Sequence, residues 1–217
     1  MTLTLLKDLY QYFTIAIVVV SLFYYRYLRS NIVGTLPVYV VVTTWLSIVV
    51  EKFMPVTANL HFVNMVIIPL EFLYFIVLYH FLSPKGKNRL LSPIFFLVYC
   101  STLAADVLLF KQKYIYLFLF SYTTGTIILL VLVILYLYRL LNSDNLLRFY
   151  KTPGFWISSG ILLFYVGTLP IHVFWNNVSS YQHPAFITTR YIFYTLMQLM
   201  YAGFILAITC TKCTEKK

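Results

Sequence analysis

The 217-residue chain is 61% hydrophobic and 10% charged, and its formal net charge at pH 7 is +10. A soluble domain has roughly a quarter charged residues and under half apolar ones, so this composition excludes an ordinary water-soluble fold. The basic residues stand in short runs between apolar segments, which argues against nucleic acid as a partner. We therefore expect one all-α membrane domain over residues 1–217.

The sequence contains seven segments of membrane-spanning size, since a helix needs about 20 predominantly apolar residues to cross the hydrocarbon core. Their approximate ranges are 9–28, 32–51, 58–82, 91–110, 114–139, 154–175 and 187–210. The first segment lacks a preceding basic region and a following small-residue cleavage site, so we expect a retained helix and not a signal peptide. The prediction is a seven-transmembrane-helix bundle in the inner or plasma membrane of the cell.

The distribution of lysine and arginine predicts the orientation, because these residues are enriched in cytoplasmic loops. One side of the bundle carries eleven of them: Arg26, Arg29, Lys85, Lys87, Arg89, Arg139, Arg148, Lys151, Lys212, Lys216 and Lys217. The opposite side carries five: Lys7, Lys52, Lys111, Lys113 and Arg190. This asymmetry predicts an N-terminus outside and a C-terminus in the cytoplasm.

Ionisable side chains inside the predicted spans are costly, so they must face the bundle interior or water. Glu71 is the foremost of them, because it lies about 16 Å from the outer end of its segment, near the midplane of a core about 30 Å thick. His61, Asn64 and Glu71 are spaced by three and seven residues, so a regular helix places them on one face.

Polar lines at helical spacing also run along four other predicted helices. They comprise Thr43, Ser47 and Glu51; Thr102 and Asp106; Tyr165, Thr168 and His172; and Arg190, Tyr194 and Gln198. Most of their ionisable members lie in the outer half, so we expect a shared outward-facing polar cavity. The candidate ligand-binding or proton-site residues are Glu71, Asp106, His172, Arg190, Gln198, Asn64, His61 and Tyr194. Hydrogen bonding between helices is the alternative interpretation of these lines, and the many other Tyr and Phe residues are expected to face lipid or form interfacial belts.

The residues of several known membrane activities are missing. The last segment has no lysine for a retinal Schiff base, and the chain has no Walker motif, nucleophile elbow or Gly-rich phosphate loop. His61, Asp106 and His172 leave open a zinc-dependent intramembrane hydrolase, although no HxxxH or HExxH pair accompanies them. We expect no cofactor and no enzymatic activity, with the metal-dependent hydrolase as an alternative.

The stretch Phe155–Gly167, FWISSGILLFYVG, is followed by Thr168. It resembles the penultimate helix of small, uncharacterised bacterial seven-helix membrane proteins of the sensor and receptor type. The resemblance covers this helix and the loop before it. It implies signal reception coupled to a separate cytoplasmic partner, and it supplies no catalytic residues.

These observations favour a receptor-like membrane sensor. A small-molecule or lipid ligand would enter the outer cavity from the membrane or its outer surface, and a cytoplasmic signalling protein would respond to the resulting helix shifts. The alternative is a small proton-coupled transporter in which Glu71 is the proton site.

Overall fold

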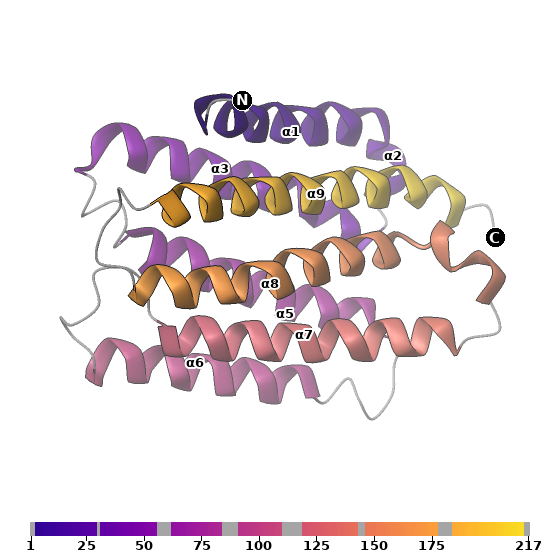
Figure 1. The fold of residues 1–217 in the computed structure, drawn as a ribbon. Helices are drawn as coiled ribbons and strands as arrows, with labels where there is room; N and C mark the ends of the chain where they lie inside the picture. Colours follow the sequence, from indigo (N-terminus) through magenta and orange to yellow (C-terminus); the bar gives the residue numbers. More distant parts are fainter. Residues whose placement is uncertain are drawn as a thin grey trace.

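The computed structural model describes residues 3–29, 31–55, 62–83, 91–109, 119–142, 146–177 and 184–214. These residues are almost wholly helical, and no strand occurs among them. The helices are α1 (Leu3–Phe23), α2 (Tyr25–Leu28), η1 (Ile32–Gly34), α3 (Thr35–Phe53), η2 (Val63–Ile67), α5 (Ile68–Leu82), α6 (Leu91–Leu109), α7 (Leu119–Leu141), η4 (Leu146–Lys151), α8 (Pro153–Asn177) and α9 (Pro184–Thr214). In Figure 1 the long helices alternate in direction, and α1 begins at the opposite end of the bundle from the end of α9.

Six helices in the described part of the chain are long and apolar enough to cross a membrane. They are Ile32–Phe53, Val63–Leu82, Leu91–Leu108, Phe120–Leu141, Pro153–Phe174 and Ala185–Lys212. These ranges match the last six predicted segments to within a few residues wherever the ends are described. The all-helical fold and the length of these helices indicate a multi-pass membrane protein.

The first predicted segment, residues 9–28, differs from the other six. Its helix α1 runs from Leu3 to Phe23, and the part of it whose side chains are described, Leu9–Phe23, is shorter than a typical membrane span. The helix breaks at Tyr24, where φ is −102° and ψ is 12°, and this residue separates α1 from α2. The described residues therefore support six spans, and the predicted crossing at the N-terminus stays a prediction.

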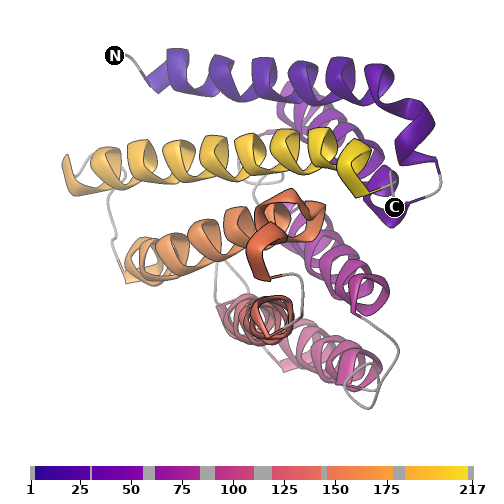
Figure 2. The same ribbon diagram turned by 90° about the vertical axis from the view of Figure 1, so that its right-hand side faces the viewer.

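Five of the long helices pack against one another in a row. α9 lies between α1 and α8, and α7 contacts α8, α6 and α5; Figure 2 shows α1, α9, α8, α7 and α6 in this order from top to bottom. A Cβ atom added to Gly203 would lie 2.9 Å from the carbonyl oxygen of Trp156, and one added to Gly160 would lie 3.1 Å from that of Met200. Small residues let helix backbones approach closely in a membrane, so both glycines are needed for the observed α8–α9 contact.

The core is centred on α5. Phe72, Phe75, Ile76 and Leu78 are buried there and belong to one hydrophobic cluster that includes side chains of the surrounding helices. Large apolar side chains also cover the outside of the bundle, as shown by Leu22, which is 71% exposed. Such a surface suits a lipid environment, in which no hydrophobic penalty attaches to exposed apolar groups.

Candidate functional site

Glu71 lies in the first turn of α5, and its carboxylate joins this helix to two others. The Tyr165 hydroxyl on α8 donates a hydrogen bond of 2.9 Å to Oε1 of Glu71. Tyr39 on α3 is a second hydrogen-bonding partner of the same carboxylate. The side chain of Glu71 is partly buried. The predicted membrane acid therefore occupies a junction of three helices, and both of these partners are tyrosine hydroxyls.

Tyrosines surround this carboxylate from several directions. Six tyrosines lie within electrostatic range of Glu71: Tyr10, Tyr39, Tyr99, Tyr122, Tyr165 and Tyr201. They belong to α1, α3, α6, α7, α8 and α9 respectively, so each long described helix other than α5 contributes one. We call this set the tyrosine cluster.

Stacked and edge-on rings hold the tyrosine cluster in place. The ring of Phe72, next to Glu71, has its centroid 5.3 Å from that of Tyr165, 5.4 Å from that of Tyr99 and 5.6 Å from that of Tyr122. One turn later on α5, the centroids of Phe75 and Tyr39 lie 5.4 Å apart. These centroid distances fall in the range at which aromatic pairs attract one another. The aromatic core therefore fixes the hydroxyls that face the carboxylate.

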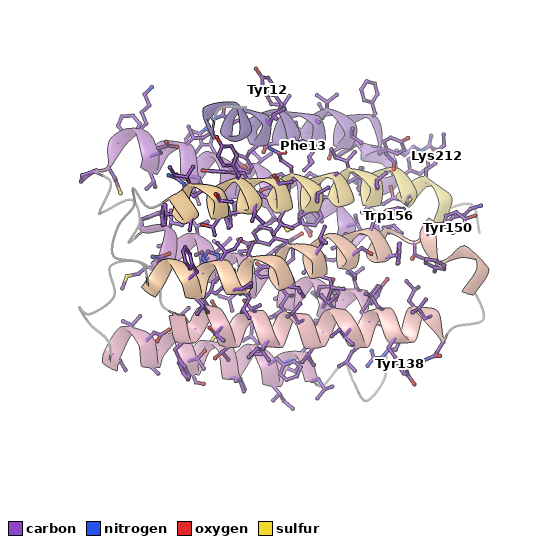
Figure 3. All side chains as sticks on the ribbon, in the orientation of Figure 1. Tyr12, Phe13, Tyr138, Tyr150, Trp156 and Lys212 are labelled. Carbon is purple, nitrogen blue, oxygen red and sulfur yellow. The ribbon has the colours of Figure 1, made fainter. Side chains whose placement is uncertain are left out.

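The expectation that the other tyrosines face lipid is wrong for the members of the tyrosine cluster apart from Tyr165, which the sequence placed on an inward polar line. It holds for residues such as Tyr12 and Tyr138, which are 65% and 66% exposed and point away from the bundle in Figure 3. A tyrosine can be buried where its hydroxyl finds a partner, because the ring itself is apolar. Tyr165 finds one in Glu71, and the Tyr122 hydroxyl lies 3.3 Å from Oγ1 of Thr168.

A second polar contact ties α1 to the bundle. The hydroxyls of Tyr10 and Thr44 are 2.9 Å apart, and Oγ1 of Thr14 lies 3.4 Å from Oγ1 of Thr44. The ring of Tyr10 stacks on that of Tyr201, with centroids 5.5 Å apart. The tyrosine cluster thus extends from the centre of the bundle to α1 through α3 and α9.

Asn64 and Glu71 do not follow the regular helical spacing that the sequence predicted. Residues Val63–Ile67 form a π-helix, η2, directly before α5. A π turn contains one residue more than an α turn, so it rotates the side chains before it by about 100° relative to those after it. Pro69 follows the π-helix and has no N–H to donate to the preceding turn. Asn64 is buried. The prediction that Asn64 and Glu71 share one face of a regular helix is wrong, because the π-helix changes the spacing between them.

Asp106 has a structural partner. Its Oδ2 atom accepts a hydrogen bond of 2.6 Å from the backbone N–H of Ser121, near the start of α7. The first N–H groups of a helix have no partner within the helix, and a carboxylate there also interacts favourably with the helix dipole. Asp106 of α6 therefore caps the N-terminus of α7. Tyr99 lies within electrostatic range of both Asp106 and Glu71.

His172 lies beside the tyrosine cluster. It is buried on α8, and its ring packs edge-on against that of Tyr122 with centroids 4.3 Å apart. The ring of Phe193 on α9 lies 5.7 Å away, also edge-on. Thr168, one turn earlier on α8, contacts the hydroxyl of the same Tyr122. Thr168 and His172, two members of the predicted polar line on α8, therefore both contact Tyr122 of α7.

The predicted residues of α9 are less closely tied to Glu71. Arg190, Tyr194 and Gln198 are each partly buried. Tyr194 lies within electrostatic range of Tyr10, which places it at the edge of the tyrosine cluster. His61 lies outside the described residues.

The alternative zinc site would need His61, Asp106 and His172. Within the described ranges, no three His, Cys, Asp or Glu side chains gather in a way that would hold a metal ion. Asp106, which is described, is bonded to the α7 backbone. The described residues therefore give the hydrolase hypothesis no support.

The sequence analysis missed Tyr39, the second hydrogen-bonding partner of Glu71. One signal was present, because Tyr39 continues the polar line of Thr43 and Ser47 by one helical turn. The hydroxyls of Thr43 and Ser47 bond to carbonyl oxygens one turn earlier in their own helix, at 3.0 and 2.9 Å. Tyr39 is therefore the member of that line that reaches Glu71, and the hydroxyls of the two smaller residues are satisfied within their own helix.

Comparison of the chain with protein-family models, with curated proteins and with solved structures gives no match.

Proposed function

We propose that this protein is a receptor-like membrane sensor whose input site is Glu71 and the tyrosine cluster. The observation that carries the proposal is the hydrogen bond from Tyr165 to Glu71, together with the bond from Tyr39, because these contacts join α8 and α3 to α5 at one carboxylate. A small-molecule or lipid ligand with a cationic or hydrogen-bonding group would compete for these partners.

The chemistry of the tyrosine hydroxyl suits such a switch. A hydroxyl can donate to a carboxylate or accept from a protonated carboxyl group or a ligand donor, so Tyr39 and Tyr165 can exchange partners without being left unsatisfied. A change at Glu71 would alter how α3 and α8 are held against α5. Interfaces between packed helices respond with shifts of about 1–2 Å, and a cytoplasmic signalling protein would detect these shifts.

The proposed topology has seven crossings, with α1 as the first and the N-terminus outside. It is supported by the position of α1 alongside α9 (Figure 2) and by its polar contact with Thr44. The proposed cytoplasmic end carries Tyr150, Trp156 and Lys212, which lie at the same end of the bundle in Figure 3. Aromatic and basic residues are typical of a cytoplasmic membrane interface. Epitope tags at the two termini test this: only the N-terminal tag should react with antibody before the cells are permeabilised.

The sensor mechanism is tested by a distance measurement between helix ends. Spin labels are placed at Phe81 on α5 and at Lys151 just before α8, two exposed positions, after the native cysteines are replaced by serine. Glu71→Gln removes the charge, so the distance distribution measured by pulsed electron paramagnetic resonance should shift by about 1–2 Å.

Glu51→Gln is the matched control, because Glu51 is an exposed acid in the last part of α3. It should leave the distribution unchanged. A Glu71→Gln distribution that superimposes on that of the wild type would contradict coupling between the carboxylate and the helix ends.

A proton-coupled transporter is the second candidate, and the π-helix next to Glu71 favours it. Transporters place ion sites at interruptions of membrane helices, and η2 ends at Ile67, four residues before Glu71. Reconstituted protein should then acidify the lumen of proteoliposomes when a substrate gradient is applied, and Glu71→Gln should abolish this. An unchanged lumenal pH with every substrate tested would count against transport.

A further inference from the structure

A groove separates α1 and α3 near the end of the bundle that contains α2. It has a volume of about 530 Å³, which lies within the usual range for ligand pockets. Val18 and Leu22 form its α1 side, and Val38, Val41 and Val42 form its α3 side. Leu22 and Val38 are 71% and 64% exposed, so the groove opens toward the outside of the bundle.

The local backbone explains why α1 and α3 leave this space. The break at Tyr24 turns α2 away from the axis of α1, and the chain then enters η1 and α3. Gly34 packs directly against the Leu28 carbonyl oxygen, where a Cβ atom would collide. α2 and η1 thus meet through backbone contact at this end, and apolar side chains of α1 and α3 line the groove beyond it.

The dimensions of the groove suit one acyl chain. Thr35 and Val42 of α3 both line it, and seven residues of helix correspond to about 10 Å. This length is about two thirds of one leaflet, which is half of a hydrocarbon core about 30 Å thick. An apolar, laterally open groove of that length is accessible to a lipid chain from within the bilayer.

The end of the groove carries polar groups that suit a phosphate. Arg29 and Asn31 line it there, and Arg29 is exposed. Oδ1 of Asn31 accepts from the backbone N–H of Val33, which leaves the amide NH₂ as a donor. In the part of the chain that the structure describes, the carboxylate on α3, Glu51, is sixteen residues from Thr35, about 24 Å along the helix. The other two carboxylates whose side chains are described, Glu71 and Asp106, bond to Tyr165 and to the backbone of Ser121. The positive charge of Arg29 therefore has no described carboxylate beside it.

We propose that the α1–α3 groove binds one acyl chain of an anionic phospholipid, whose phosphate is held by Arg29 and Asn31. Arg29 supplies charge-assisted hydrogen bonds in a planar fork that matches phosphate oxygens. Arg26, an exposed residue one turn earlier, adds positive charge at the same end. The site is distinct from the tyrosine cluster and does not depend on the sensor function.

The first test is retention of lipid by the purified full-length protein. Protein in mild detergent is equilibrated with dioleoyl phosphatidylglycerol or dioleoyl phosphatidylcholine, and bound lipid is counted by native mass spectrometry. Wild-type protein should retain phosphatidylglycerol preferentially, and Arg29→Gln should weaken this retention about tenfold, the effect of losing one hydrogen bond to a charged group. Arg139→Gln on α7 removes a positive charge away from the groove and should change nothing.

Equal loss in Arg29→Gln and Arg139→Gln would show nonspecific attraction and overturn the proposal. Unchanged retention in Arg29→Gln would also overturn it.

The second test uses the unmodified protein, so it does not depend on the folding of a variant. Phosphatidylglycerol with a photoreactive diazirine in its acyl chain should label peptides that contain Val38, Val41 or Leu22, and excess phosphatidylglycerol should reduce this labelling more than phosphatidylcholine. Labelling spread evenly over exposed faces, including Leu97 and Leu108 of α6, would contradict a dedicated site. A groove that stays unlabelled would also contradict the proposal.

Discussion

Two acids that the sequence places inside the membrane have different partners. At the centre of the bundle, Glu71 accepts hydrogen bonds from side-chain hydroxyls on two other helices. At the α6–α7 contact, Asp106 accepts a backbone N–H at the start of α7. The backbone N–H cannot rotate away or accept a hydrogen bond, whereas a hydroxyl can do both.

Because of this difference, the contacts of the two acids should respond differently when the carboxylate loses its charge. If Asp106 loses its charge, the N–H of Ser121 loses its best acceptor and the dipole of α7 loses a favourable charge. If Glu71 loses its charge, Tyr39 and Tyr165 can reorient and keep a hydrogen bond. The effect of neutralising a membrane acid therefore depends on its hydrogen-bonding partner and not on its burial alone.

The largest expected effect is on stability at Asp106. Asp106→Ala should lower the free energy of unfolding by about 2–3 kcal/mol, because a charge-assisted hydrogen bond is lost and a helix N–H is left unpaired. Asp106→Asn keeps an acceptor oxygen and should cost about 1 kcal/mol. Denaturation in mixed micelles, followed by circular dichroism, measures both. Equal losses in the two variants would mean that hydrogen-bond acceptance by the side chain is unimportant here.

The next effect concerns a donor to Glu71. Tyr165→Phe keeps the buried ring and removes the hydroxyl, so we expect a loss of about 1.5 kcal/mol in the same unfolding measurement. Tyr138→Phe is the control, because Tyr138 is 66% exposed, and it should change stability by no more than about 0.5 kcal/mol. A Tyr165→Phe protein as stable as this control would remove Tyr165 as a partner of the carboxylate.

A hydrogen bond between two uncharged side chains gives a reference for the stability that Glu71 and Asp106 contribute through their hydrogen bonds. The hydroxyls of Tyr79 and Ser158 lie 2.8 Å apart between α5 and α8. Ser158→Ala should cost about 0.6 kcal/mol, the average for such contacts between membrane helices. A cost as large as that of Tyr165→Phe would indicate that the charge of Glu71 adds nothing to its hydrogen bonds.

The sequence was sufficient to predict the helical membrane fold and the inward position of Glu71, because both follow from hydrophobic length and from the cost of a charge exposed to lipid. It was not sufficient to predict the hydrogen-bonding partners of Glu71. Tyr10 and Tyr39 have apolar rings and polar hydroxyls, so hydropathy cannot tell an inward tyrosine from one that faces lipid, and nearly continuous apolar surfaces leave helix rotation undetermined.

Two local features also escaped prediction from the sequence. The π-helix before Pro69 changes the register between Asn64 and Glu71, and helical spacing assumes that no such turn occurs. The partner of Asp106 is a backbone amide, which has no signature in the side-chain pattern. The second feature depends on the contact between α6 and α7, which helical spacing within one segment does not describe.

A double-mutant cycle between Glu71 and Tyr165 tests the central claim most directly, namely that a tyrosine hydroxyl holds this carboxylate in the bundle. Glu71→Gln, Tyr165→Phe and the double variant are compared with the wild type in reversible unfolding. We expect a coupling energy of about 1 kcal/mol, because loss of the hydroxyl matters less once the charge is gone. A coupling energy of zero, with each single variant folded, would contradict the account.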